Sequence, residues 1–560
     1  MRTTRFSSCR LAALFAPTVI ALAACGGSDD PPAAVNPAPG VALSISGTAA
    51  VGAAIAGGRV EALCLVGDGV ATTLADGSYN LAIEDGRLPC SMRVTSADLT
   101  TVLHSAATGS GSSAIANITP ATELAMAQLY GRNPAAVHQN FAAADAAALT
   151  PAAVQTAGNA TIALLATAGV TISGNPISAP LAIDDANARA LHTLRANLES
   201  SGTTLNDVTN AIIIGKGGTP VGTVAPLPLE QLVAASAPNC KALRSGRYRV
   251  VFAGPNEDTG VVTVDAPTLK VTDPNGTVTT LVANGDCRYI VPDDGSELAV
   301  TSAGIGVVRS QEGAAGTYAL GLVFPEQVHP VSATEGTWNL IGLGDIDSDN
   351  GQGTPRLFAG TISFNAVGRS VGTTVICGDL RNCVDESPLP GEVHTVNAAG
   401  GFNFDGGRNF VYKLSSGQKL LVAWAADGAF VLATPKAPAT VPPLDVLRRN
   451  LDFTLTQTFT ANALPSISEN TPRSFDAAAG IYTRDGVIAG SNGVTVPQRI
   501  ELDRPLQGFA HRIPEAVTDS AGTRRNVGEW VVLQLPGMGF SPVAIVGNNT
   551  LVLSVLQTAP

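Results

Sequence analysis

The chain has 560 residues, of which 45 % are apolar and 14 % are charged, and its formal net charge is −12. At about 150 residues per domain this length predicts three or four domains, and the apolar share excludes wholesale disorder. The acidic balance argues against a nucleic-acid partner, because nucleic-acid binders carry a basic face. The 59 glycines and 36 prolines favour short strands joined by many turns.

The N-terminus has the pattern of an export signal. Three arginines precede an uncharged, mostly apolar run over residues 11–24, which has the length of a signal h-region and is short for a membrane span. The run ends in Leu-Ala-Ala-Cys at Cys25 and resembles the lipobox of bacterial lipoproteins. The resemblance implies a signal peptide over residues 1–24 and lipidation of Cys25. The alternative is a plain secretory signal with an incidental cysteine.

Residues 25–40 contain four prolines and predict a polar tether that does not fold. Gly26, not an aspartate, follows Cys25, and by the resemblance this favours the bacterial outer membrane, with the protein facing the periplasm or the surface. The membrane is then a partner through the lipid on Cys25. Loss of residues 1–24 removes three arginines and no acid, which takes the formal net charge from −12 to −15.

Six of the eight cysteines remain once Cys9 leaves with the signal and Cys25 is lipidated. An even number in an oxidising compartment predicts disulfides, each adding about 2–4 kcal/mol. A metal site is the weaker interpretation, because no histidine lies close by in sequence and the last two cysteines are six residues apart. Neighbours in the chain are favoured as pairs: Cys64–Cys90, Cys240–Cys287 and Cys377–Cys383.

Residues 41–118 predict a small β-sandwich, because short alternating runs lie between turn signals. The segment Ala75-Asp76-Gly77-Ser78-Tyr79, with Ser46-Gly47-Thr48 upstream, resembles the carboxypeptidase regulatory-like (transthyretin-like, Ig-like) module of bacterial surface proteins. The resemblance implies that the Asp-Gly turn joins two strands and that Tyr79 packs into the core. It also implies a spacer or recognition fold in place of a catalyst.

Residues 119–235 are rich in Ala and Leu and predict helices. Thr119-Pro120, Asn133-Pro134 and Thr150-Pro151 are three helix starts, since the Thr or Asn side chain accepts from free N–H groups and Pro fits the first turn. Asp185 is favourably charged for the start of another. Four or five helices of about 10–18 residues are expected, forming a small bundle.

Residues 236–560 lack helical periodicity and have frequent Gly turns, which predicts antiparallel β-barrel or sandwich units over 236–440 and 441–560. The whole chain is therefore expected to be a multidomain α+β protein. Ser245-Gly246-Arg247-Tyr248 and Glu335-Gly336-Thr337-Trp338 are alike and lie 90 residues apart, which suggests a duplication.

Gly336-Thr337-Trp338 resembles the Gly-x-Trp motif of lipocalin-like barrels, where the Trp closes one end of a cup for apolar ligands. The alternative is that Trp338 is a core residue at the start of a strand. Trp424 and Trp530 are likewise expected in strand cores, not as platforms for sugars.

Asp345, Asp347 and Asp349 occupy alternate positions of one loop, and such carboxylates can converge on calcium. The loop departs from the EF-hand at Asn350 and Arg356, so calcium would bind with a Kd of only ~10⁻⁴–10⁻³ M. The alternative is a solvated acidic turn. No other cofactor is expected.

Motifs of hydrolases and nucleotide-binding proteins are missing from the sequence, and we assign no catalytic residue. Ser416-Gly417-Gln418-Lys419 matches Ser-x-x-Lys by letter but falls in an expected hairpin turn. The six histidines are scattered, with His138 and His192 expected on polar helix faces.

The sequence therefore favours a membrane-anchored envelope lipoprotein with a non-enzymatic binding or structural role. An apolar ligand, a glycan or an envelope protein are the partners left open. The alternative is a hydrolase of an envelope or extracellular polymer, with its site built from β-domain loops. That alternative needs a cluster of Ser, His and Asp or a pair of carboxylates.

Overall fold

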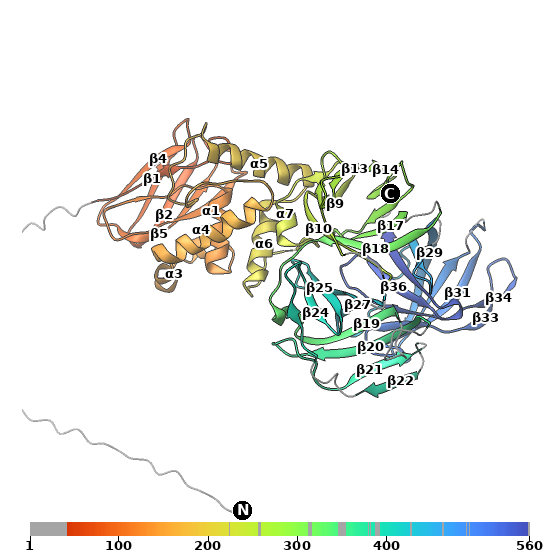
Figure 1. Ribbon diagram of the computed structural model, residues 1–560. Helices are drawn as coiled ribbons and strands as arrows, with labels where there is room; N and C mark the ends of the chain where they lie inside the picture. Colours follow the sequence, from red (N-terminus) through yellow and green to blue (C-terminus); the bar gives the residue numbers. More distant parts are fainter. Residues whose placement is uncertain are drawn as a thin grey trace, which may run out of the picture. The chain divides into compact units, whose positions relative to one another are not determined.

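The computed structural model describes residues 42–557 apart from 223, 256–258, 312–315, 345–353, 379, 381, 387–391, 426–427, 462–463, 489 and 492. The expected signal peptide, the tether and Cys25 lie outside the described residues, as do Asp345, Asp347 and Asp349. The described chain is mostly β, with several sheets and barrel-like sheets, as the sequence predicted (Figure 1). None of its helices has the length and apolar character needed to span a bilayer.

Two sheets share one core near the start of the described chain. Their strand orders are β4-β1-β7 and β3-β2-β5-β6, with β1 and β7 parallel. Tyr79 follows the Asp76-Gly77 turn and is buried in the core that both sheets contribute to. Asp76 stabilises that turn by accepting from the Ser78 backbone N–H at 3.0 Å. The strands are β1 (Leu43–Thr48), β2 (Arg59–Val66), β3 (Asp68–Thr72), β4 (Ser78–Ile83), β5 (Arg87–Thr95), β6 (Val102–Ala107) and β7 (Ser113–Ile115).

The helical segment begins where the sequence indicated. Thr119, Asn133 and Thr150 each cap a helix by accepting a backbone N–H, and Asp185 caps another. Two of the helices have only six residues, shorter than expected. The helices are α1 (Pro120–Tyr130), α2 (Pro134–Gln139), α3 (Ala143–Ala148), α4 (Pro151–Ala166), α5 (Ala186–Ser201), α6 (Leu205–Gly215) and α7 (Leu229–Leu232).

Helix α1 divides its side chains between helices and strands, so the segment is not shown to be a separate bundle. Leu124 packs with residues of α4, α5 and α6, whereas Met126 packs with Ala106 of β6. The Thr122 hydroxyl also donates to the His104 carbonyl of β6 at 2.8 Å.

The remaining chain forms three successive antiparallel meanders. In each one, the first strand pairs with both the second and the last strand: β10 with β11 and β18, β19 with β20 and β27, and β28 with β29 and β37. We call them the first meander (246–325), the second meander (336–435) and the barrel (448–557). The two openings that look alike in the sequence thus each begin a sheet with the same strand order, and the barrel shares the pairing of first and last strand.

The first meander has the strand order β13-β12-β11-β10-β18-β17-β16-β15-β14. The hairpin of β8 (Ser236–Ala237) and β9 (Cys240–Arg244) precedes it. Its strands are β10 (Gly246–Phe252), β11 (Val261–Asp265), β12 (Lys270–Thr272), β13 (Val278–Thr280), β14 (Val282–Ala283), β15 (Arg288–Ile290), β16 (Glu297–Val300), β17 (Gly306–Gln311) and β18 (Tyr318–Pro325).

The second meander repeats that order as β22-β21-β20-β19-β27-β26-β25-β24-β23. A short 3-10 helix, Val331–Thr334, precedes it. Its strands are β19 (Gly336–Gly344), β20 (Arg356–Phe364), β21 (Thr374–Gly378), β22 (Asn382–Glu386), β23 (Thr395–Val396), β24 (Phe402–Phe404), β25 (Gly407–Lys413), β26 (Lys419–Trp424) and β27 (Phe430–Pro435).

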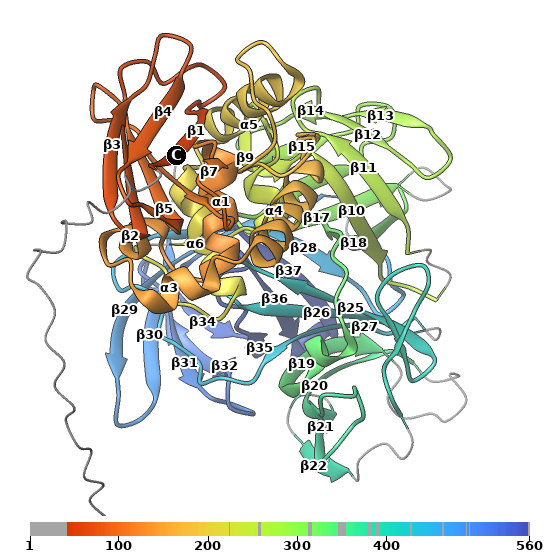
Figure 2. The same cartoon turned by 90° about the vertical axis from the view of Figure 1, so that its left-hand side faces the viewer.

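The barrel is closed, with the order β28-β29-β30-β31-β32-β35-β36-β37 (Figure 2). The pair β33 (Glu515–Thr518) and β34 (Arg524–Val527) forms a separate hairpin between β32 and β35. The barrel strands are β28 (Arg448–Leu455), β29 (Ser466–Asp476), β30 (Ile481–Val487), β31 (Thr495–Leu502), β32 (Phe509–Arg512), β35 (Trp530–Leu533), β36 (Phe540–Ile545) and β37 (Thr550–Gln557).

One large buried cluster, the common core, takes apolar side chains from all three units. Leu322 of the first meander, Leu432 of the second and Leu553 of the barrel are members, and each is fully buried. Successive strand residues point to opposite faces, so every strand in this cluster presents its other set of side chains away from the common core. What fills that opposite face differs between the units and defines the site.

Candidate ligand site in the barrel

An aromatic side chain at the third position of the first strand fills the opposite face in both meanders. Tyr248 of β10 and Trp338 of β19 are each about 1 % exposed and sit in separate apolar clusters. Both bond to a carbonyl four residues earlier: Tyr248 Oη donates to Arg244 at 2.9 Å, and Trp338 Nε1 donates to Thr334 at 2.7 Å. These aromatic plugs occupy equivalent places in the two meanders.

The glycine of each motif has a backbone reason. Gly246 has φ +147° and Gly336 has φ +121°, a region that residues with a Cβ rarely adopt. The Gly-x-Tyr and Gly-x-Trp motifs therefore combine a backbone requirement with a core side chain. This explains why the two openings look alike in the sequence.

The barrel has no aromatic plug. Its first strand begins with Arg448, and Asn450 stands at the third position, where Tyr248 and Trp338 stand in the meanders. The barrel interior contains a cavity of about 720 Å³, and Asn450 lines it. Pockets for drug-sized ligands have volumes of about 300–1,000 Å³, so the cavity is of the right size for a small molecule.

Strand alternation gives this cavity two kinds of wall. On β28, Leu451, Phe453 and Leu455 face the common core, whereas the intervening polar residues line the cavity. The strands β28 and β29 supply mostly polar side chains to the lining, and β35, β36 and β37 supply mostly apolar ones. The interior is thus amphipathic.

Two arginines and one tryptophan lie close together inside the barrel. The guanidinium carbon of Arg484 lies 4.8 Å from the ring centre of Trp530, and that of Arg512 lies 5.3 Å from it. Arg484 Nε donates to Gln498 Oε1 at 2.9 Å, and Arg512 Nε donates to the Gly528 carbonyl at 2.7 Å. Each arginine is therefore held at its Nε, and among the described residues no acceptor bonds to the outer N–H groups of either fork, which can bind a ligand.

Asp452 is a carboxylate that lines the same cavity as these two arginines. Ser554 Oγ donates to Asp452 Oδ1 at 2.6 Å, and Ser468 also bonds to this carboxylate. Burial raises the pKa of Asp452, although those hydrogen bonds and the charge of Arg484 act in the opposite direction. Asp452 lies within 4.0 Å of no basic side chain among the described ion pairs.

The lining is therefore electropositive. Arg448, Arg484 and Arg512 line the cavity together with Asp452 and Glu469, and Glu469 already pairs with Arg449 at 3.5 Å. Burial lowers the pKa of Arg484, and burial together with the nearby Arg484 charge lowers the pKa of Arg512 to about 10. Both arginines remain charged at neutral pH.

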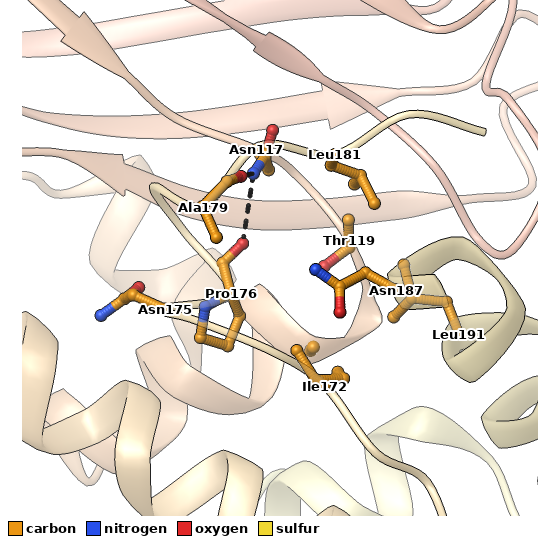
Figure 3. A pocket seen from close by; sticks show the side chains of 10 residues that line it. Asn117, Thr119, Ile172, Asn175, Pro176, Ala179, Leu181, Asn187 and Leu191 are labelled. Atoms are coloured by element: carbon orange, nitrogen blue, oxygen red, sulfur yellow. Dashed lines mark hydrogen bonds between the residues drawn. The ribbon is translucent and has the colours of Figure 1, made fainter. Parts of the chain in front are cut away.

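Two other cavities are much smaller. One of about 60 Å³ lies beside Arg249 and His329. Another, of about 10 Å³, lies where Asn117 donates to the Ala179 carbonyl at 2.6 Å and more weakly to that of Pro176 (Figure 3). A space of about 10 Å³ holds one water at most, so Asn117 serves there to join two segments of the chain.

Among the described residues, one serine bonds to a histidine, and both are buried. Ser91 Oγ lies 3.0 Å from His138 Nδ1, and these residues are 1 % and 3 % exposed. His138 was expected on a polar face, and that prediction is wrong because α2 packs against β5 and β6. Burial lowers the pKa of His138 to about 4. A polymer chain has no access to this serine, whereas His192 is exposed as expected.

His394 is also a structural histidine. Its ring packs against three phenylalanines of the second meander. Its Nδ1 lies 3.2 Å from the Gly368 carbonyl, and its Nε2 lies 2.9 Å from Asn409 Nδ2. These partners favour the neutral form with the proton on Nδ1, and burial lowers the pKa of His394 to about 4. None of the six histidines lines the barrel cavity.

The remaining predicted residues fall as follows. The three disulfides join the pairs that chain order favoured, Cys64–Cys90, Cys240–Cys287 and Cys377–Cys383. Trp530 is buried on a strand in a small apolar cluster, as expected, and it also lines the cavity because its neighbours on β35 point to the common core. Ser416 to Gln418 form the turn between β25 and β26, as expected. Within the described ranges, no group of three His, Cys, Asp or Glu residues is placed to hold a metal.

Comparisons of the chain with protein-family models, with curated proteins and with solved structures found no match.

Proposed function

We propose that this protein is a lipid-anchored binding protein of the bacterial outer membrane and that the barrel binds a small molecule without transforming it. The observation that supports this most is the 720 Å³ cavity in the barrel, set beside the aromatic plugs of its two sister units. Closed barrels of eight strands are just wide enough to be filled by side chains or to hold one small ligand. The barrel has the second arrangement.

In this proposal the rest of the chain exports the barrel, anchors it to the membrane and holds it at a distance from the anchor. Residues 1–24 direct export, Cys25 carries the lipid, and residues 25–40 form the tether. The sandwich acts as a carboxypeptidase regulatory-like module, and the helices, taken as a small bundle, act as a spacer. The three disulfides support an oxidising compartment, where such bonds persist.

A test is to restore the aromatic plug in the barrel. The variant Asn450→Trp places in the barrel the side chain that the second meander has at the equivalent position. The probes are anionic 8-anilinonaphthalene-1-sulfonate and neutral N-phenyl-1-naphthylamine, whose fluorescence rises in water-poor cavities. We expect the wild type to bind at least one of them and Asn450→Trp to lose that binding.

The matched control is Arg499→Trp, which adds the same side chain at an exposed position of β31. It should bind the probes as the wild type does. Equal binding by Asn450→Trp and wild type, or binding of neither probe by the wild type, would show that the barrel is not a binding cup.

A further inference from the structure

We infer that the barrel selects a small organic anion, a carboxylate, which it holds on the guanidinium groups of Arg484 and Arg512 beside Trp530. This inference rests on the proposed binding function and specifies the ligand class. Three observations support the inference independently. They are the charges inside the barrel, the positions of Arg484 and Arg512 beside Trp530, and the polar and apolar residues that line the cavity.

The first argument is the cost of the charges. Three arginines and two carboxylates line the interior. Glu469 already pairs with Arg449, which leaves Asp452 as the lining carboxylate without a described ion pair. The three arginines are half-buried, and taking charge out of water without a partner is unfavourable, so residues that break a packing rule of this kind are expected at functional sites. The whole chain is acidic, at −12, so a positive interior does not follow from composition.

The second argument is geometry. The guanidinium carbons of Arg484 and Arg512 lie 4.8 and 5.3 Å from the ring centre of Trp530, so the indole holds both cations close together beside the cavity. Apart from the Nε bonds to Gln498 and Gly528, the described structure gives Arg484 and Arg512 no hydrogen-bond acceptor. A planar fork of N–H groups matches the two oxygens of a carboxylate.

The third argument is the body of the ligand. The apolar wall includes Val532, Val543 and Ile545, and the polar wall includes Asn450 and Asn470. A carboxylate with an aliphatic or aromatic body would use the first wall, and a hydroxylated sugar acid would use the second. Both share the carboxylate, and the choice between them is a matter for the experiment.

Isothermal titration calorimetry on the full exported chain tests the inference with matched probe pairs. The apolar pair is 2-naphthoate and its neutral amide, 2-naphthamide. The hydroxylated pair is glucuronate and neutral glucuronamide. We expect one acid to bind roughly 10- to 100-fold more tightly than its amide, because a hydrogen bond to a charged group is worth about 1.5–3 kcal/mol. The acid that binds identifies the body.

The variants Arg484→Gln and Arg512→Gln should each reduce that acid's affinity about tenfold or more and bring acid and amide close together. Arg499→Gln removes the same charge from the exposed outer face of β31 and should leave the affinity unchanged. The comparison of acid with amide uses the wild type alone, so it holds even for a variant that folds poorly.

The outcomes separate this inference from the proposed function. An amide that binds as tightly as its acid, or Arg→Gln variants that bind the acid like the wild type, would refute the carboxylate and leave the binding cup in place. Neither acid binding, while a fluorescent probe still binds and is blocked by Asn450→Trp, would also refute the carboxylate alone. Absence of all binding would refute both.

Discussion

Truncation of the aromatic plug in the second meander should be the most destabilising single change there. Trp338 is about 1 % exposed and packs among apolar side chains of β19, β20, β25, β26 and β27. A buried Trp→Ala change costs about 3–5 kcal/mol through lost transfer energy and the cavity it leaves. The variant also strands the Thr334 carbonyl, which accepts from Trp338 Nε1, and a lost buried partner adds about 1 kcal/mol or more. We therefore expect about 4–6 kcal/mol for Trp338→Ala.

Urea denaturation followed by far-ultraviolet circular dichroism measures this loss as a lower midpoint. The matched control is Trp424→Ala, because Trp424 Nε1 also donates to a carbonyl, that of Gly254 at 2.8 Å, but its ring is only partly buried. The control should lose clearly less stability. A loss below about 1 kcal/mol for Trp338→Ala, or an equal loss in the control, would contradict the plug interpretation.

Three further predictions concern the rest of the chain. The folded pKa of His394, about 4, lies below the unfolded value of 6.5, so its stabilising contribution is complete above pH 6.5 and is lost as the pH falls toward 4. By pH 5 the loss is on the order of 1–2 kcal/mol, and His394→Gln should show a smaller drop in urea midpoint between pH 7 and pH 5; an equal drop would contradict this. Chain entropy predicts that removing Cys240–Cys287, which spans 47 residues, costs about 4 kcal/mol, against about 2 for Cys377–Cys383, which spans 6. Paired Cys→Ser variants in thermal melts check the order, and the reverse order would refute it. Labelled palmitate should enter the protein in bacterial cells and be absent from Cys25→Ala, and unchanged labelling would exclude the lipid anchor.

Features that depend on neighbouring residues were predictable. Thr119 and Thr150 start helices because a side-chain oxygen and a following proline satisfy the first turn whatever packs nearby. The Gly-x-Tyr and Gly-x-Trp openings indicated a duplication because a positive φ and a buried aromatic leave a mark on consecutive residues. The favoured cysteine pairs also agree with the structure, because each pair lies within one local group of strands.

The site itself was harder to predict from the sequence. The pattern Arg448, Asn450, Asp452 between Leu451 and Phe453 shows an amphipathic strand, but it does not say which face is inside. In an ordinary barrel that faces water, the apolar set would fill the interior. Here the outer faces of three units meet in a common core, so the apolar set points outward and the polar set points into the barrel. For the same reason Trp530 faces a cavity.

The sequence alone thus determined the β-rich class, the helix starts and the repeated opening, because each depends on local pattern or composition, and it predicts an export signal. Tertiary structure alone decided that there are three meanders, that the last one closes, and that its interior holds Arg484, Arg512 and Trp530 around open space. Strand closure and sheet packing choose the face that each residue presents, and those choices depend on partners far away in the chain. The absence of an aromatic residue at Asn450 is informative only by comparison with Tyr248 and Trp338, which stand at the same third position of the first strand in the two meanders.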